Sequence, residues 1–264
     1  MIYENISGVP RFSCDEFAPK KTKYCVLIPI INEGERIKAE LQKAQSAGIS
    51  ALCDIIICDG GSTDGSTAPD LLSSLGVSAL LTKMDAGKQG AQLRMGFWWA
   101  LQRGYEGFIT IDGNNKDSIC DVGRFTEKLD EGYDFVQGSR FIKGGRAVNT
   151  PPLRYLAVRL VHAPVIFLTA RHWFTDTTNA YRAHSKKYIT HPKVLPFRDV
   201  FSSYELLAYL SVRASQLGLK VCEVPVTRAY PKGEKTPTKI SFLKGNSGLM
   251  RILLLNAMGK YHCD

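Results

Sequence analysis

The sequence lacks the features that are typical of membrane-spanning proteins, of secreted proteins and of proteins with cysteine-bound zinc. It has no run of about 18 apolar residues, so no transmembrane helix is predicted. No apolar segment typical of a signal peptide opens the chain. Its seven cysteines are scattered, and no two have the C-x-x-C spacing of a zinc or redox motif. We therefore expect reduced thiols in a cytoplasmic protein.

Two nucleotide-binding motifs are also missing. No G-x-G-x-x-G follows the first predicted strand, which argues against an NAD-dependent dehydrogenase, and no P-loop is present. The net charge of +9, from 34 Lys and Arg against 25 Asp and Glu, favours anionic partners such as nucleotide phosphates or an acidic membrane. No nucleic-acid-binding motif accompanies that charge, so we expect no nucleic-acid partner.

The hydrophobic pattern predicts an α/β fold with a mostly parallel sheet. Uninterrupted apolar runs separated by helical segments are typical of parallel strands buried on both faces. The predicted strands of the first half are Tyr24–Ile31, Cys53–Cys58, Val77–Leu81 and Gly107–Ile111. The helices between them are predicted at Glu35–Ala47, after Ser66 and at Gln89–Arg103.

The second half continues this pattern less regularly. Its predicted helices are Asp121–Leu129, Leu153–Ala170, Tyr204–Leu217 and Ile240–Met258, with strands at Asp134–Gly138 and Lys220–Val226. Residues 1–23 mix Pro, Gly and charge, and we predict that they form an N-terminal extension that lies over the domain or is partly mobile. No linker divides residues 24–264, so we expect one domain there.

An acidic residue follows each of three predicted strands: Glu33, Asp59 and Asp112. Ligands of open α/β sheets bind beyond the carboxyl ends of the strands, so these side chains should face one crevice. We expect Asp112 to position a metal-bound diphosphate, since Mg²⁺ takes one or two protein carboxylates and completes its shell with substrate phosphates. The alternative is that Asp112 only caps a helix that begins near Ser118.

Short motifs in a fixed order give the sequence a specific resemblance. They are Ile28-Pro-Ile-Ile-Asn-Glu33, Asp59-Gly-Gly-Ser-Thr-Asp64, Ala86-Gly-Lys-Gln-Gly-Ala91, Asp112-Gly-Asn114, Gln137-Gly-Ser-Arg-Phe141, Asp176-Thr-Thr-Asn-Ala-Tyr-Arg182 and Glu223-Val-Pro-Val226. Together they span nearly the whole chain. The sequence resembles the inverting family-2 glycosyltransferases, and among them the dolichyl- and polyprenyl-phosphate sugar synthases of the dolichol-phosphate mannosyltransferase type.

The resemblance implies a GT-A fold, a single Rossmann-like domain with a nucleotide-sugar half (24–117) and an acceptor half (118–264). It implies that Asp112 and Asn114 match the metal-binding D-x-D and hold Mg²⁺ or Mn²⁺. Asn114 replaces the second Asp, which should weaken the metal site. The expected nucleotide-binding residues are Pro29, Glu33, Asp59, Ser62, Asp64, Lys88, Asp112 and Gly113. The alternative for Lys88 is that it is a solvent-exposed lysine at the start of a helix and does not contact the nucleotide.

The implied chemistry is displacement at an anomeric carbon, and the acceptor decides which groups assist it. An anionic phosphate acceptor needs cations and no base; the candidates are Lys116, Arg140, Arg154 (or Arg159), Arg182, Arg228 and Lys239. A hydroxyl acceptor needs a general base, for which the candidates are Asp176 and Glu205, then Asp199. The predicted catalytic set is Asp112, Asp176, Glu205 and Arg140.

We therefore expect an inverting hexosyltransferase that moves a sugar from a nucleotide sugar to a polyprenyl phosphate or another precursor of surface glycans. The apolar helices Leu153–Ala170 and Phe242–Met258, flanked by Arg and Lys, fit either core packing or peripheral binding at the inner face of the membrane. Two alternatives stay open: a catalytically silent nucleotide-sugar-binding subunit, and a sugar nucleotidyltransferase.

Overall fold

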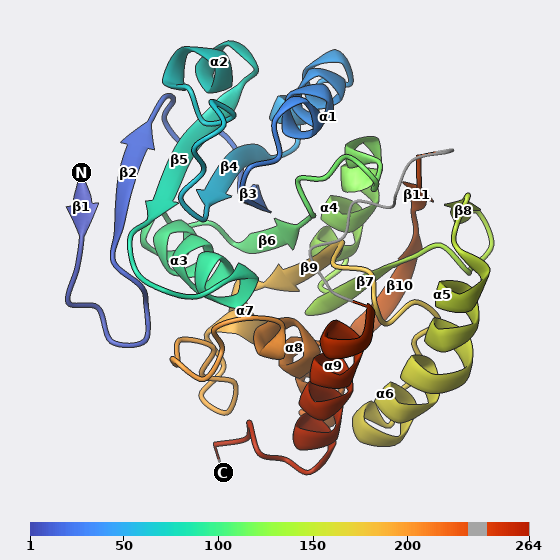
Figure 1. The fold of residues 1–264 in the computed structure, drawn as a ribbon. Helices are drawn as coiled ribbons and strands as arrows, with labels where there is room; N and C mark the ends of the chain where they lie inside the picture. Colours follow the sequence, from blue (N-terminus) through green and yellow to red (C-terminus); the bar gives the residue numbers. More distant parts are fainter. Residues whose placement is uncertain (232–241, 264) are drawn as a thin grey trace.

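The computed structural model describes residues 1–231 and 242–263, apart from the side chains of residues 153–154 and 242–247. A twisted sheet runs through the middle of the molecule, with helices on both faces (Figure 1). Two predicted phosphate-binding side chains, those of Arg154 and Lys239, lie outside the described residues.

The described part of the central sheet has nine strands in the order β1-β2-β5-β4-β3-β6-β9-β7-β10. Strands β2 and β9 run antiparallel to both of their neighbours, and all the other pairings of this sheet are parallel. The bounds are β1 (Ile2–Tyr3), β2 (Phe12–Glu16), β3 (Tyr24–Ile30), β4 (Asp54–Asp59), β5 (Val77–Lys83), β6 (Gly107–Thr110), β7 (Phe135–Ser139), β9 (Arg182–Ser185) and β10 (Val221–Pro225). A second, two-stranded sheet pairs β8 (Arg146–Val148) with β11 (Thr227–Ala229) in parallel. This architecture confirms the predicted α/β class.

Alternating side chains of the strands feed two hydrophobic cores, one on each face of the sheet. In β3, Cys25 and Leu27 join one core, and Val26 and Ile28 join the other. Because both faces are covered, β3 is an apolar run without polar alternation. The helices of one layer are α1 (Glu35–Ser46), α2 (Pro69–Ser74) and α4 (Val122–Asp130). The other layer contains α3 (Gln89–Gln102), α6 (Ala163–Ala170), α8 (Glu205–Gln216) and α9 (Phe242–Ala257).

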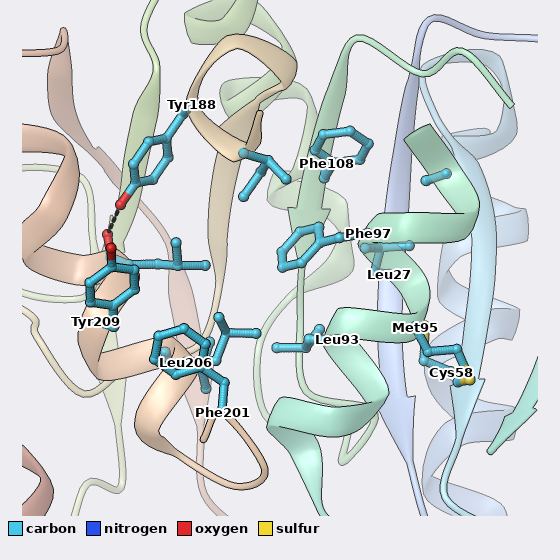
Figure 2. Close-up of a cluster of buried hydrophobic side chains, with 14 of the residues drawn as sticks. Leu27, Cys58, Leu93, Met95, Phe97, Phe108, Tyr188, Phe201, Leu206 and Tyr209 are labelled. Atoms are coloured by element: carbon cyan, nitrogen blue, oxygen red, sulfur yellow. Dashed lines mark hydrogen bonds between the residues drawn. The ribbon is translucent and has the colours of Figure 1, made fainter. Parts of the chain in front are cut away.

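Helix α3 is the centre of the second layer. Leu93 and Phe97 are buried and point from α3 toward Phe108 of β6 and Leu206 of α8 (Figure 2). The ring of Phe97 meets that of Phe108 edge-on at a centroid distance of 5.6 Å. This packing fixes the amino ends of α3 and α8 beside the carboxyl ends of the parallel strands, where the candidate site lies.

Two parts of the sheet differ from expectation, one at its edge and one in its interior. Residues 1–23 contribute β1 and β2, and β2 pairs with β5 from Phe12 opposite Lys83 to Glu16 opposite Ala79. Strand β9 and the short helix α7 (Lys186–Ile189) were not predicted. Strand β9 contains a charged residue, a histidine and a serine, so its local pattern is not that of a buried strand.

The predicted helix Leu153–Ala170 forms as three consecutive segments. They are α5 (Pro152–Ala157), a π-helical segment (Val158–His162) and α6. Pro164 lies in the first turn of α6, where its missing N–H would break the regular helical ladder, and the π-helical turn directly precedes it. Among the described residues, no helix is both long and apolar enough to cross a bilayer.

Candidate active site

The carboxyl ends of β3, β4 and β6 meet at one edge of the sheet. Asp59, the last residue of β4, lies opposite Ile30, the last residue of β3. Thr110 ends β6 opposite Leu27, and Asp112 follows two residues later. The register therefore brings Asp59 and Asp112 to the same edge, as expected from the sequence.

Asp112 is surrounded by donors from three different segments. Gln89 Nε2 donates to its Oδ1 at 2.9 Å, and Asn114 Nδ2 lies 3.4 Å from Oδ2. Arg228 Nη2 lies 3.6 Å from the same Oδ2. The carboxylate is 23% exposed, so a ligand can still reach it. The helix-capping alternative is wrong, because the turn that begins after Ser118 has no side-chain cap.

The loop after Asp112 is attached to the carboxyl-terminal part of the chain through Arg228. The buried guanidinium of Arg228 forms an ion pair with Asp117, whose side chain is fully buried. Backbone hydrogen bonds join Ser118 N to Thr227 O (2.9 Å) and Ala229 N to Lys116 O (2.8 Å). Burial opposes the charge of Arg228, yet Asp117 and Asp112 raise its pKa. For Asp117, burial outweighs Arg228 and raises the pKa to about 6.

Tyr230 connects these cations to a second group. Its ring lies beneath the ammonium of Lys116 and the guanidinium of Arg228, each 5.7 Å from the ring centroid. Its hydroxyl lies 3.5 Å from Arg140 Nη1. Tyr230 is not among the residues predicted from the sequence, although an aromatic residue within a basic loop was a usable signal.

Arg140 and Asp176 form a buried two-point ion pair. Arg140 Nε and Nη2 donate to Asp176 Oδ2 and Oδ1 at 2.6 and 2.7 Å, and the backbone N–H of Arg140 donates to Oδ2 at 3.1 Å. Their side chains are 1% and 0% exposed. Although burial disfavours the charged guanidinium, Asp176 raises the pKa of Arg140. Because Arg140 donates to both carboxylate oxygens, Asp176 is poorly placed to take a proton from a substrate.

Arg182 does not have the environment expected of a phosphate-binding residue. Its guanidinium donates to the carbonyl oxygens of Asn179, Leu207 and Thr177 at 2.7–3.1 Å. Burial lowers the pKa of Arg182 to about 10. These contacts place Arg182 in the interior, where it joins β9 to α8, and this corrects its assignment to the acceptor-binding group.

The expected nucleotide-binding loops hold each other in place. Asp59 accepts hydrogen bonds from Gly61 N and Ser62 N, and Asp64 accepts one from Gly34 N at 2.9 Å. Asn32 Oδ1 accepts a hydrogen bond from the backbone N–H of Thr63 at 2.8 Å. Hydrogen bonds from Ser66 lower the pKa of Asp64.

The other expected nucleotide-binding residues line the same edge. Pro29 is partly exposed at the end of β3, and Glu33 pairs with Arg36 at 2.8 Å. Gly113 is buried where a Cβ atom would lie 2.5 Å from Ile30 Cγ2, so only glycine fits there. Lys88 is exposed, and its backbone N–H donates to Ser202 O at 2.7 Å. None of these contacts tests nucleotide binding itself, so these assignments stay predictions.

The amino end of α8 lies close to the same site. The pKa of Tyr204 is raised by burial and by the charge of Asp112. The next residue, Glu205, accepts a hydrogen bond from Ser203 N at 2.6 Å. Asp199, the third candidate base, instead pairs with Arg94 at 2.8 Å. Of the three candidate bases, Glu205 alone begins a helix whose dipole favours a negative charge.

Two residues that support the Asp112 loop were not predicted. Gln89, the first residue of α3, contacts Asp112 directly, and its position inside the Ala86–Ala91 motif was a usable signal. Glu40 of α1 is fully buried and accepts the backbone N–H of Asn115 at 3.0 Å, where the chain has φ of 56°. Burial raises the pKa of Glu40 well above its usual value. Nothing in its helical sequence distinguishes Glu40 from a surface glutamate.

The side chains near Asp112 fit a divalent cation only if a substrate supplies most of its ligands. No group of three or more His, Cys, Asp or Glu suited to a metal occurs within residues 1–231 and 242–263. Asn114 directs Nδ2 toward Asp112, and its Oδ1 accepts the N–H of Lys116 at 3.2 Å. Asp112 thus offers one carboxylate, which suffices for Mg²⁺ when substrate phosphates complete the shell.

The sheet and its covering helices have the GT-A fold of solved glycosyltransferases. Glucosyl-3-phosphoglycerate synthase from Mycobacterium tuberculosis, solved with Mn²⁺, UDP and glucosyl-3-phosphoglycerate, superposes with a TM-score of 0.60 over 90% of this chain and 79% of that one. The sequences are 17% identical, so this likeness concerns the fold. No family model matches the chain.

Proteins with similar sequences indicate which kind of glycosyltransferase the chain resembles. The chain is 27% identical to the polyprenol monophosphomannose synthase of Mycolicibacterium smegmatis, over 76% of each protein. It is 28% identical to the undecaprenyl-phosphate mannosyltransferase of Micrococcus luteus, over 76% of this chain and 81% of that protein. These relatives are glycosyltransferases, which confirms the resemblance seen in the motifs and favours a transferase over the silent-subunit and nucleotidyltransferase alternatives.

Proposed function

We propose that the protein transfers a hexosyl group, with inversion, from a nucleotide sugar to a polyprenyl phosphate. The observation that carries the proposal is the set of cations beside Asp112. Arg228 contacts Asp112, and Tyr230 joins Arg228 and Lys116 to Arg140. Such a cluster suits a reaction with one anionic leaving group and one anionic acceptor.

On the donor side, Asp112 would hold Mg²⁺ or Mn²⁺ together with the diphosphate, and that cation would stabilise charge on the departing phosphate. Arg228 and Lys116 would share this role from the protein side. Gln89 orients the Asp112 carboxylate by donating to Oδ1. The loops around Asp59 and Glu33 would bind the nucleoside.

On the acceptor side, a phosphate is already an anion and needs no base. That suits a site in which Asp176 is neutralised by Arg140. Arg140 would contribute positive potential toward the acceptor while it stays paired with Asp176. A polyprenyl phosphate lies in a membrane, so the enzyme would act peripherally at its inner face. The names of the two mannosyltransferase relatives support this acceptor.

A direct test is donor binding and turnover. Calorimetry with a panel of nucleoside diphosphates and nucleotide sugars, in Mn²⁺, in Mg²⁺ and in chelator, should give metal-dependent binding of one nucleotide. Adding polyprenyl phosphate in detergent should then release free nucleoside diphosphate. Binding without release would favour a silent subunit, and no binding of any nucleotide would refute the proposal.

Asn114→Asp is expected to tighten Mn²⁺ binding in the presence of nucleoside diphosphate. The substitution adds a second carboxylate beside Asp112, where Asn114 now places an amide at 3.4 Å. Hard divalent cations gain affinity with each added carboxylate ligand. Mn²⁺ titration monitored by calorimetry measures the effect. Equal Mn²⁺ affinity in the variant and the parent would remove residue 114 from the metal site.

A further inference from the structure

One polar side chain of α3 is buried beside the candidate site. Gln92 is 5% exposed and lies among the buried residues of that helix. Its Nε2 donates to Ile30 O at 2.6 Å and to Cys58 O at 2.8 Å. A primary amide nitrogen carries two N–H donors, so both donors of Gln92 are used. A buried amide is costly unless it is hydrogen-bonded, and Gln92 makes its bonds to the backbone of the central sheet.

The two carbonyl groups belong to neighbouring strands, at the edge where both strands end. Ile30 is the last residue of β3, and Cys58 directly precedes Asp59, the last residue of β4. In the parallel ladder, Pro29 lies opposite Cys58 and Ile30 lies opposite Asp59. Because one nitrogen atom of Gln92 is bonded to both strands, it fixes the separation of their carboxyl ends.

Two glycines bring the helix and the strand ends close enough for this contact. A Cβ atom on Gly96 of α3 would lie 2.6 Å from Cys58 Sγ. A Cβ atom on Gly60 would lie 3.1 Å from Gln92 Nε2 and 3.3 Å from Ile30 O. The backbone N–H of Gly60 also donates to Ile30 O at 2.9 Å. The helix, both strand ends and the turn after β4 therefore meet around the Gln92 amide.

The two loops that are expected to bind the nucleoside begin at these strand ends. Glu33 lies three residues beyond the carbonyl bonded in β3, and Asp59 lies one residue beyond the carbonyl bonded in β4. Farther out, Asn32 N donates to Ser62 Oγ at 2.9 Å, so the loops also hold each other. Gln92 lies at the base of this pair of loops, and a change in strand separation there would move one loop relative to the other.

The same side of α3 contacts a third strand end through a second glutamine. Gln89 lies three residues before Gln92, which places both side chains on one side of the helix. Gln89 Nε2 donates to Asp112 Oδ1 at 2.9 Å, beyond the end of β6. Gln89 therefore contacts the carboxylate expected to hold the metal, whereas Gln92 contacts the base of the nucleoside-binding loops. Loss of the Gln92 amide should leave the Gln89–Asp112 contact in place.

We propose that Gln92 is a positioning residue for nucleotide binding. By holding the ends of β3 and β4 at a fixed separation, its amide sets the distance between the Glu33 loop and the Asp59 loop. Gln92 does not itself contact the nucleotide, because its amide is buried and both of its donors are used. The identity of the ligand rests on the proposed function, whereas the effect on the two loops depends on Gln92 alone.

The variant Gln92→Met removes both donors and keeps an unbranched side chain of similar length. We expect the Kd of the nucleoside diphosphate to rise about tenfold, because two hydrogen bonds to buried carbonyl groups are lost. KM for the nucleotide sugar should rise by a similar factor, while kcat stays within about threefold of the parent because Gln89 and Asp112 are unchanged. Gln92→Leu differs in shape but also lacks donors, so it should give the same result.

Hydrogen exchange of the ligand-free enzyme tests the two loops directly. Backbone amides of residues 59–64 should exchange about tenfold faster in Gln92→Met than in the parent, and those of β7 at an unchanged rate. A variant that only lowers the stability of the whole fold would speed exchange in both segments. The matched control is Gln102→Met, which changes an exposed glutamine at the last position of α3 and should behave as the parent in every measurement.

Unchanged nucleotide affinity in both Gln92 variants, or unchanged exchange of residues 59–64, would overturn the proposal. A fall in kcat with KM unchanged, or the same effects in Gln102→Met, would also overturn it. If the parent binds no nucleotide, the proposed function is refuted, and the exchange measurement still decides whether Gln92 holds the loops. If the parent binds and transfers while both Gln92 variants match it, the proposed function stands and the role of Gln92 is refuted.

Discussion

Replacing Asp112 with alanine is expected to lower turnover roughly 10²–10³-fold, the range seen when one group that stabilises transition-state charge is removed. Asp112 is the partly exposed carboxylate on which Gln89, Asn114 and Arg228 converge. Its loss removes the protein charge that would hold the metal-bound diphosphate. Steady-state release of nucleoside diphosphate measures the effect.

The variant Asp112→Asn tests the effect of the negative charge alone, because asparagine has nearly the same size and shape as aspartate. The amide can still accept a hydrogen bond from Gln89 but cannot neutralise a cation, so its turnover should fall nearly as far as that of the alanine variant. Asp70→Ala, an exposed carboxylate in the first turn of α2, is the control and should keep parent activity. Near-parent activity of Asp112→Ala would remove Asp112 from both the metal and the diphosphate roles.

Arg140→Ala is expected to lose stability as well as activity. The variant leaves Asp176, which is 0% exposed, as an uncompensated buried charge. Breaking such a pair from one side typically costs about 3–5 kcal/mol of unfolding free energy. The loss of positive potential at the acceptor side should also raise KM for the acceptor. Denaturant unfolding and steady-state kinetics measure the two effects.

The control for this prediction is Arg11→Ala. Arg11 pairs with Asp85 at 2.8 Å on the surface, where its side chain is 56% exposed. Exposed pairs contribute about 0–1 kcal/mol, so this variant should unfold nearly as the parent does. The double variant Arg140→Met with Asp176→Leu removes both charges and should recover much of the stability but no activity. Unchanged unfolding of Arg140→Ala would contradict the importance of the pair.

The first half of the fold and its strand-end residues were predictable because their signals are local. Buried parallel strands such as β3 and β4 consist of short runs of mostly apolar residues, which can be recognised in the sequence. The parallel arrangement then requires Asp59 and Asp112 to reach one edge. The predicted carboxyl ends of β3 and β4 each differ from the observed ones by one residue, since apolar content alone does not specify the last ladder hydrogen bond.

The second half was less predictable because its order depends on pairing between distant segments. Strand β9 inserts antiparallel between β6 and β7, and its sequence does not show this. Arg182 matches a motif of the family, yet carbonyl oxygens of Asn179, Leu207 and Thr177 accept its hydrogen bonds. A motif identifies the residue but does not specify where its guanidinium points.

The sequence by itself determined the class of fold and the edge of the sheet to which Asp59 and Asp112 come, where the candidate site lies. These follow from apolar periodicity and from residues adjacent to strand ends. Only the tertiary structure decided which charges neutralise each other. Arg140 and Asp176 are 36 residues apart, and Arg228 and Asp117 are 111 apart. Each cation pairs with the carboxylate that the fold buries beside it, because a charge removed from water requires a partner at contact distance.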